Sequence, residues 1–241
     1  MAFVHSKQSR VLVNSDHVSG SITAWNVTSE RSVSEVTTIL DEGAKFIPGL
    51  KAGSISLSGL FDGAEGAFDE IITDTDGVLD GLLTTVCPAG FDVGSPCFIT
   101  VSNSSGYTID SPVADAVSVS VEATPQVGVD RARLHHGHTA ETATGEAASV
   151  DHTADLSPTT SGGVASLHVT AASGTTPTLD VKLQHSVDDA VWVDLASFTQ
   201  ATAATSERIT VAGTVERYTR ASWTIAGTSP EFTFAAAFAR R

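Results

Sequence analysis

Residues 42–63 read Glu-Gly-Ala-Lys-Phe-Ile-Pro-Gly-Leu-Lys-Ala-Gly-Ser-Ile-Ser-Leu-Ser-Gly-Leu-Phe-Asp-Gly, and the rest of the chain is organised around this stretch. Its glycines and its proline are typical of a turn. Apolar and small polar residues then alternate, which predicts a strand with one apolar face and one face of serine and glycine. Serine and glycine cover little surface, so we expect water or another flat backbone against that face. The apolar positions are Ile55, Leu57 and Leu60, and the polar ones are Ser54, Ser56, Ser58 and Gly59.

The segments on either side of this stretch predict further strands and one helix. Ser19–Val27 and Ser32–Leu40 contain many β-branched residues and predict strands, with Asp41–Gly49 as the loop that follows. From about Ala64 to Val86 the apolar residues fall on one arc at the helical period. We therefore expect one α-helix that packs against a sheet and ends before Pro88.

Residues 1–18 are predicted to form an extended arm. The segment is polar apart from a few residues such as Val11, Leu12 and Val13. Such an arm gains little by packing on its own body, so we expect it to pair with a neighbouring molecule.

After Pro125 the apolar periodicity fades, and the chain becomes rich in Ala, Thr, Gly and His. We place a first domain at residues 1–134, a flexible linker at 135–161 and a second domain at 162–241. The predicted fold class is mainly β: an N-terminal β-sandwich or barrel with one flanking α-helix, then a C-terminal antiparallel β-sandwich. Its strands are expected at Val164–Thr170, Leu179–His185, Val191–Leu195, Ser206–Val211, Arg217–Ile225 and Phe232–Phe238.

The chain is strongly acidic, with a formal net charge of −15 that falls mostly in the first 150 residues. Such a body repels phosphate backbones, which disfavours specific nucleic-acid binding but is compatible with DNA that passes by. The acidity is equally consistent with a need for solubility or with a salt-rich host.

The N-terminus has no apolar block, and the sequence contains no apolar run of membrane-spanning length. We therefore expect a soluble protein that is made in the cytosol and contacts no membrane. Cys87 and Cys97 are then expected as reduced thiols, although a disulfide in an assembled extracellular particle remains an alternative.

The sequence contains few candidates for chemistry. His135-His136-Gly-His138, with His152, is the most ligand-like group, but a flexible linker offers no fixed geometry, so no physiological metal is expected. Asp74-Thr-Asp76-Gly77 is similar to a calcium loop that lacks its first and last acids, and a solvated helix face is the preferred interpretation. No phosphate loop, nucleophile elbow or zinc-protease motif is present. We expect neither catalysis nor a cofactor.

The first half of the chain resembles the major tail tube proteins of long-tailed bacterial and archaeal viruses. The likeness rests on the strand at Ser19–Val27, the Thr37-Thr38 pair, a charged loop with a glycine, and the run Pro-Gly-Leu-Lys-x-Gly-x-Ile-x-Leu-x-Gly-x-Phe-Asp at 48–62. The second half resembles a compact β-module that is appended to several virion proteins of tailed phages. That likeness rests on Gly-Thr-Thr-Pro, Leu-Gln-His-Ser-Val-Asp-Asp and the closing Phe-Thr-Phe-Ala-Ala-Ala-Phe-Ala-Arg.

The resemblance implies a structural virion protein that is assembled in the host cytoplasm and resides in the viral tail. Such subunits form hexameric rings, which stack into the conduit for DNA ejection, here with the C-terminal domain displayed outside. Their partners are copies of themselves, other tail proteins such as the tape measure and the tail terminator, and the DNA in transit. For this chain, the resemblance implies that the residues in contact between rings are Val11, Leu12, Val13, Phe46 and Ile47. It also implies that Ser54, Ser56 and Ser58 line the lumen. Lys51 is expected to pair with a carboxylate or to turn away from the channel.

A second hypothesis is a virion decoration or host-attachment protein whose C-terminal sandwich binds glycans. Trp192, Trp223 and Tyr218 are the aromatic residues that would stack on sugars. Aromatic residues in strands more often belong to the core, which favours the tube hypothesis.

Overall fold

The computed structural model describes residues 4–64, 66–73, 81–152 and 158–241. Most of this chain is β-strand, so the prediction of a mainly β fold is confirmed. The helices within these ranges are a short 3₁₀ turn, η1 (Ser6–Gln8), and α1 (Phe68–Ile72). Neither has the length and apolar character that a bilayer crossing would need.

The chain divides into two compact units. The large unit contains Met1–Gly20, Leu83–Ile99 and Asp130–Arg241, and the small unit contains Ser21–Leu82 and Thr100–Val129. The chain thus leaves the large unit twice and returns to it twice. This division differs from the predicted domains at 1–134 and 162–241.

The segment predicted as a linker, residues 135–161, contains ordered strands. β8 (Asp130–Glu141) pairs with β14 (Tyr218–Arg240) and is buried from Leu134 to Gly137. β9 (Gly145–Glu146) and β10 (Val150–Asp151) also pair with β14. Histidine and glycine do not contribute to an apolar pattern, so apolar periodicity does not indicate a buried strand here.

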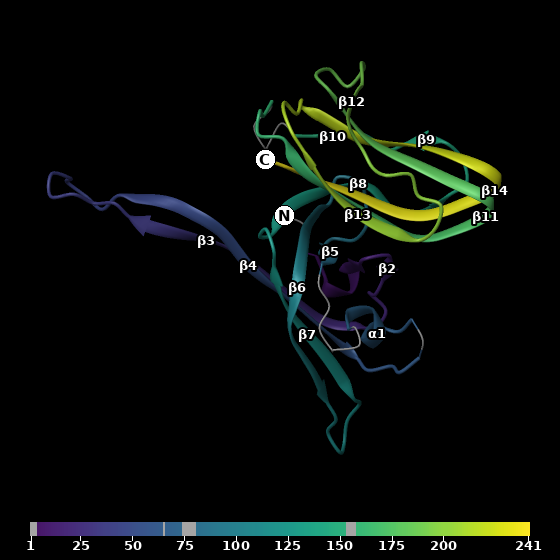
Figure 1. The fold of residues 1–241 in the computed structure, drawn as a ribbon, viewed down its shortest axis with the longest axis horizontal. Coiled ribbons are helices and arrows are strands. Elements are labelled where there is room, and N and C mark those ends of the chain that lie inside the picture. The colour runs from purple at the N-terminus through teal and green to yellow at the C-terminus, as the bar shows by residue number, and fades with distance from the viewer. Residues whose placement is uncertain (1–3, 65, 74–80, 153–157) are drawn as a thin grey trace. The chain divides into compact units, whose positions relative to one another are not determined.

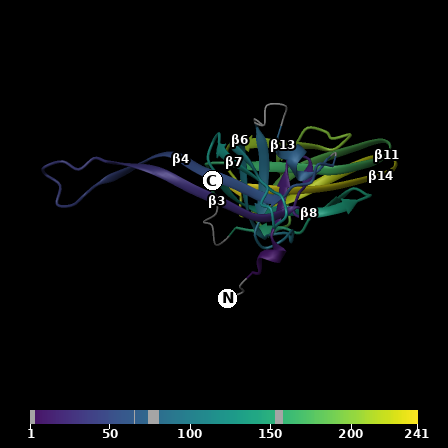
Figure 2. The same ribbon diagram turned by 90° about the horizontal axis from the view of Figure 1, so that it is seen from below.

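The small unit is an antiparallel sheet with the strand order β3-β4-β7-β6. β3 (Ile22–Glu35) and β4 (Phe46–Leu60) pair over their whole length, whereas β7 (Ser118–Pro125) pairs with β4 only over residues 55–60. The hairpin of β3 and β4 therefore extends beyond β7 as a two-stranded ribbon, which Figures 1 and 2 show as the long arm of this unit. β6 (Pro96–Asp110) pairs with β7 through its second half.

Two sequence predictions around this hairpin are corrected. β3 is one continuous strand rather than two, and β4 begins at Phe46, inside the predicted loop Asp41–Gly49. The Pro48-Gly49 pair lies within the ribbon, next to a register shift between Arg31 and Val33. Proline has no N–H to donate to a neighbouring strand. It is tolerated there because the ribbon has an open edge and because the bulge interrupts the hydrogen bonds between the two strands.

The predicted helix at 64–86 is also corrected. α1 covers only Phe68–Ile72, residues 74–80 lie outside the described part of the chain, and Leu82–Cys87 form strand β5. β5 is buried at every position and pairs with β1 (Arg10–Val13). An apolar run that is buried on both faces has no alternation, so its pattern alone cannot separate a strand from a helix.

The large unit is built around two long strands, β11 (Gly163–Ser186) and β14, which pair along their lengths. Each was predicted as two strands. The turn-like sequences Gly174-Thr-Thr-Pro and Gly227-Thr-Ser-Pro face each other in the pairing, where the register shifts. Residues on both sides of this point belong to one core, so the strands bend there and pass from one layer of a sandwich to the other (Figure 1). β12 (Val193–Ser197) and β13 (Thr205–Val211) pair with β11.

Candidate functional site

The outer part of the β3–β4 hairpin, residues 31–50, exposes a group of apolar side chains. Leu40 and Leu50 are 90% and 85% exposed, and Phe46 and Ile47 are 57% and 51% exposed. Among the described residues, no other strand pairs with this part of the hairpin. Large apolar side chains that gather on one exposed element mark a candidate interaction site. The exposed apolar residues of the outer hairpin are Val33, Val36, Ile39, Leu40, Phe46, Ile47 and Leu50.

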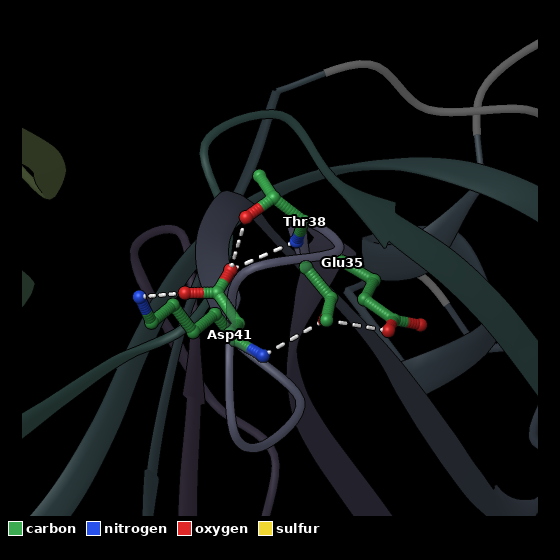
Figure 3. A network of polar contacts seen from close by, with 5 residues as sticks. Glu35, Thr38 and Asp41 are labelled. Atoms are coloured by element: carbon green, nitrogen blue, oxygen red, sulfur yellow. Dashed lines mark hydrogen bonds and ion pairs between the residues drawn. The ribbon is translucent and has the colours of Figure 1, made fainter.

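Polar contacts fix the tip of this hairpin. The Asp41 carboxylate accepts hydrogen bonds from the backbone N–H of Thr38 at 2.8 Å and from its hydroxyl at 3.0 Å, and it forms an ion pair with Lys45. The Thr37 hydroxyl donates to Glu35 at 2.6 Å and accepts from the Lys45 N–H at 3.0 Å. Figure 3 shows Glu35, Thr38 and Asp41 within this network of polar contacts.

The tip network holds its charges in a defined arrangement. The Lys45 ammonium and the Thr38 donors lower the pKa of Asp41, because all of them favour the carboxylate. A loop whose shape is already fixed loses less conformational entropy when it binds a partner. The tip is therefore suited to present the neighbouring apolar residues rather than to cover them.

The small unit also carries a polar face, which the sequence predicted in part. Ser54, Ser56 and Ser58 lie on the opposite side of β4 from the buried Ile55 and Leu57. The register extends this face across the sheet, because residues paired with the serines share their side. The polar face comprises Ala24, Asn26 and Thr28 of β3, Ser54, Ser56 and Ser58 of β4, Ser118, Ser120 and Glu122 of β7, and Gly106, Thr108 and Asp110 of β6. The exposed Leu60 of β4, which pairs with Ser118, lies on the same side of the sheet and not on the apolar face that the sequence predicted.

This polar face contains no lysine or arginine among the residues that define it. Lys51 follows the alternation of Ile55 and pairs with Arg31 of β3, so strand geometry places it on the other side of the ribbon. The contribution of β7 was detectable in the sequence, as the alternating run Val-Ser-Val-Ser-Val at 117–121. The place of β7 beside β4 depends on the pairing of two strands that are distant in sequence.

Val11, Leu12 and Val13 do not lie on a free arm. They form β1, which pairs with β2 (Asp16–His17) and β5, and they are 1%, 0% and 0% exposed. Their side chains are part of the core of the large unit, so they are not available to a neighbouring molecule. The sequence could not distinguish three apolar residues of an arm from three of a short buried strand.

The histidines are structural members of the large unit. His135 and His152 both hydrogen-bond to the Thr219 hydroxyl, at 2.6 and 2.7 Å. Burial and the nearby His152 lower the pKa of His135 to about 3. Within the described ranges, no three side chains of the metal-binding types come together.

A buried polar cluster that sequence reasoning missed lies at His168. Its Nε2 is 2.8 Å from the Thr85 hydroxyl, which is 3.2 Å from the Ser166 hydroxyl, and its Nδ1 donates to the Asn14 carbonyl at 2.6 Å. The three side chains are at most 1% exposed, so a substrate cannot reach the hydroxyls. The cluster satisfies buried polar groups and ties β5 and β11 to the turn at Asn14.

The aromatic residues proposed for glycan stacking are already in contact with other groups. Trp223 is 7% exposed and belongs to the core of the large unit. The Arg220 guanidinium lies 4.3 Å from the centre of the Trp192 ring, and that of Arg217 lies 4.7 Å from the Tyr218 ring. One face of each of these two rings is thus occupied by a cation.

Cys87 and Cys97 are both free thiols and both buried in the large unit. Burial, together with the neighbouring Cys87 thiol, raises the pKa of Cys97. The thiol form is therefore favoured at this position.

A scan against models of protein families finds no match to this chain. A search of curated proteins finds no match either.

Comparison with solved structures finds similar chains in viral and virus-like particles. A chain from the virion of a native gene transfer agent particle is 13% identical with a TM-score of 0.40, over 50% of this chain and 94% of that one. A chain from the tail of an empty gene transfer agent particle with C6 symmetry is 14% identical with a TM-score of 0.39, over 49% and 92%. SPP1 Dit, described as a paradigm of the hub adsorption apparatus in phages that infect Gram-positive bacteria, is 9% identical with a TM-score of 0.33, over 94% and 98%. Every one of these TM-scores is below 0.5, so the likenesses do not show a shared function.

Proposed function

We propose that this chain is a structural protein of a viral tail, and specifically the major tail tube subunit. Copies would form hexameric rings that stack into the conduit for DNA ejection. The observation that carries the proposal is the outer hairpin, an arm of two strands that exposes seven large apolar side chains. Such an arm gains its stability from a partner surface, and in a polymer of identical subunits that partner is the next copy.

Within the small unit, the polar face is proposed to line the lumen. DNA must slide through a tail without sticking, and each contact between a phosphate and a basic side chain would add affinity. The polar face of serine, threonine, glycine and acidic residues meets that requirement. Residues 162–241 of the large unit are proposed to be displayed on the outside of the tube.

The proposed contacts between rings are restricted to the outer hairpin, at Phe46 and Ile47. The burial of Val11, Leu12 and Val13 removes these residues from the interface.

Electron microscopy of the purified full chain tests the proposal. We expect tubes of uniform diameter with an axial stack of rings. The alternative, a decoration or attachment protein that binds glycans, gives a small oligomer that retains binding to sugars. Small oligomers over a range of salt and protein concentrations would contradict the tube assignment.

A further inference from the structure

Cys87 and Cys97 meet at the end of one hairpin of the large unit. β5 and β6 are neighbours in the sheet, and residues 88–95 connect them. A parallel connection would need about a dozen residues or more, so these two strands are antiparallel. Cys87 is the last residue of β5, and Cys97 follows the first residue of β6. The two cysteines therefore lie on adjacent strands, close to the loop that joins them.

Both thiols are enclosed within the sheet. Cys87 pairs with Arg10 of β1 on its other side, and Cys97 pairs with Ala132 of β8. Both cysteines are 0% exposed, and their side chains hydrogen-bond to each other. A single buried cysteine acts as a small apolar residue. Two sulfur atoms in contact can in addition form a covalent bond.

The loop between the two strands is held by backbone hydrogen bonds. The Gly94 N–H donates to the Leu134 carbonyl at 2.8 Å, and the Leu134 N–H donates to the Ser95 carbonyl at 3.0 Å. Gly90 and Gly94 have φ angles of 93° and 84°, which favour glycine. The loop thus fixes the ends of β5 and β6 beside each other.

Strand spacing suits a covalent link at this place. Opposite residues of an antiparallel pair have Cα atoms about 4.5 to 5.5 Å apart. A disulfide spans Cα distances of about 4.4 to 6.8 Å. A bond between neighbouring strands therefore requires little movement of the backbone.

We propose that Cys87 and Cys97 form an intramolecular disulfide when the folded chain meets an oxidant of the peroxide class. With hydrogen peroxide, one thiolate sulfur attacks the O–O bond. An S–O bond forms, the O–O bond breaks, and the leaving hydroxide takes up the proton of the thiol as water. The second sulfur then attacks the first, so that the S–S bond forms, the S–O bond breaks and a second water leaves with the second proton. The two thiols lose two electrons, and the peroxide gains them.

The surroundings of the pair make this reaction slow. The attacking species is the thiolate, and burial raises the pKa of Cys97, which favours its thiol form. In a reducing cytosol the pair therefore stays reduced, whereas an oxidising environment allows the bond to form and persist. The inference rests on the fold of the large unit and does not depend on the proposed tail function.

Mass spectrometry of the full chain tests the proposal. The chain is reduced, freed of reductant, exposed to dilute hydrogen peroxide, then unfolded and alkylated. We expect the number of alkylated thiols to fall from two to none, with a peptide that joins Cys87 to Cys97. Dithiothreitol should restore both thiols. The chain should remain a single covalent species on a non-reducing gel, because both partners lie in the same hairpin.

Thermal unfolding provides a second readout. A disulfide between residues 87 and 97 restricts the unfolded chain, so the unfolding temperature should rise by about 5 to 10 °C after oxidation. Dithiothreitol should reverse this rise. The comparison uses one chain in two redox states, so it needs no variant that must fold.

Cys87→Ser and Cys97→Ser are the matched controls, since each leaves one thiol of the pair. Peroxide should not raise the unfolding temperature of either variant. The remaining cysteine should instead be trapped as a sulfenic acid by a 1,3-dione. Met1 also takes up oxygen, in the parent chain and in both variants, so any effect that the variants share belongs to that oxidation.

Four results would overturn the proposal. Two thiols that stay alkylatable after peroxide would show that the sulfurs are not placed to react. A disulfide between two chains would show that the partner is another copy. Bond formation only in urea would assign it to the unfolded chain. A lower unfolding temperature in the oxidised chain would show that the hairpin does not fit the bond.

Discussion

His135 and His168 are fully buried in the large unit and hydrogen-bond to neutral partners. Burial lowers the pKa of His135 from 6.5 to about 3, and it lowers the pKa of His168 from 6.5 to about 4. Neighbouring histidines further disfavour the protonated form of these two rings, because His152 faces His135 and His138 lies near His168. The folded chain therefore keeps both rings neutral at pH values at which the unfolded chain protonates them.

The first prediction follows from this difference in pKa. Below pH 6.5 the unfolded state binds more protons than the folded state, so the free energy of unfolding decreases as the pH falls toward 4. Each such histidine contributes a slope of up to about 1.4 kcal/mol per pH unit. Urea unfolding at pH 7 and pH 5 measures the effect. His168→Gln should reduce the loss between these pH values by about 2 kcal/mol.

The control for this experiment is His5→Gln, because His5 is exposed. We expect this variant to keep the pH dependence of the parent chain. An unchanged pH dependence in His168→Gln would show that the buried imidazole is not the group responsible.

Among the elements, the paired bulges of β11 and β14 decide how the large unit closes. Gly174 and Gly227 adopt φ angles of 109° and 128°, and the nearby Thr176 and Ser229 both have φ of 48°. A Cβ at position 227 would approach the Thr176 carbonyl oxygen to 2.9 Å. The bend requires glycine there because both the backbone angle and the space exclude a side chain.

The second prediction is that Gly227→Ala destabilises the large unit by about 1 to 3 kcal/mol, the usual cost of a strained backbone conformation. Denaturant unfolding measures the loss. Gly20→Ala, where no atom lies within 4 Å of the new Cβ, should be close to neutral. Equal stability of the two variants would contradict the role of the bulge.

The β3–β4 hairpin is the element on which assembly is proposed to depend. The third prediction is that replacing Phe46 and Ile47 with Asp leaves a folded subunit that no longer forms tubes. Each buried apolar residue would contribute about 1.5 to 3 kcal/mol per subunit interface, and the added charges would repel the acidic neighbour. Circular dichroism checks the fold, and electron microscopy checks the assembly.

Val113→Asp is the control for the hairpin variant, because Val113 is another exposed apolar residue of the small unit, at 108% exposure. We expect it to assemble normally. Normal tubes from the Phe46 and Ile47 variant would remove the outer hairpin from the proposed interface.

For the whole molecule, the distribution of charge is the property that the proposed conduit requires. The net charge of −15 gives a phosphate polymer no general attraction. The polar face of the small unit likewise offers a phosphate no attraction, because its defining residues are neutral or acidic.

The fourth prediction concerns this polar face. Replacing Ser54, Ser56 and Ser58 with Lys should leave rings able to form, since Ser54 is exposed and Ser56 and Ser58 are only half-buried. The added charges should slow the passage of DNA at low salt. The retention of DNA should decrease as salt increases, because phosphate contacts release counterions. Genome ejection, or DNA binding by tubes in solution, measures the effect.

A triple lysine variant at Thr202, Ala203 and Ala204, in an exposed loop of the large unit, adds the same charge elsewhere. It should not retain DNA. If ejection by the serine variant is unchanged at low salt, the polar face does not line the lumen.

The sequence by itself determined the properties that depend on local pattern. The alternation of Ile55 and Leu57 with serines predicted the two faces of β4. The run Val-Ser-Val-Ser-Val at 117–121 has the same alternation and indicates β7. The predominance of β-strand and the acidic character also followed from the sequence. These features are local because side chains alternate across any strand, whatever it pairs with.

Only the tertiary structure decided which strands pair and which segments are buried. Leu82–Cys87 is a strand because β1 lies beside it, and His135 and His136 are interior because β14 covers β8. One pocket of the large unit is likewise lined by Arg131 and Arg240, which are more than 100 positions apart in the sequence. Burial and pairing are set by partners distant in sequence, so a local pattern does not contain them.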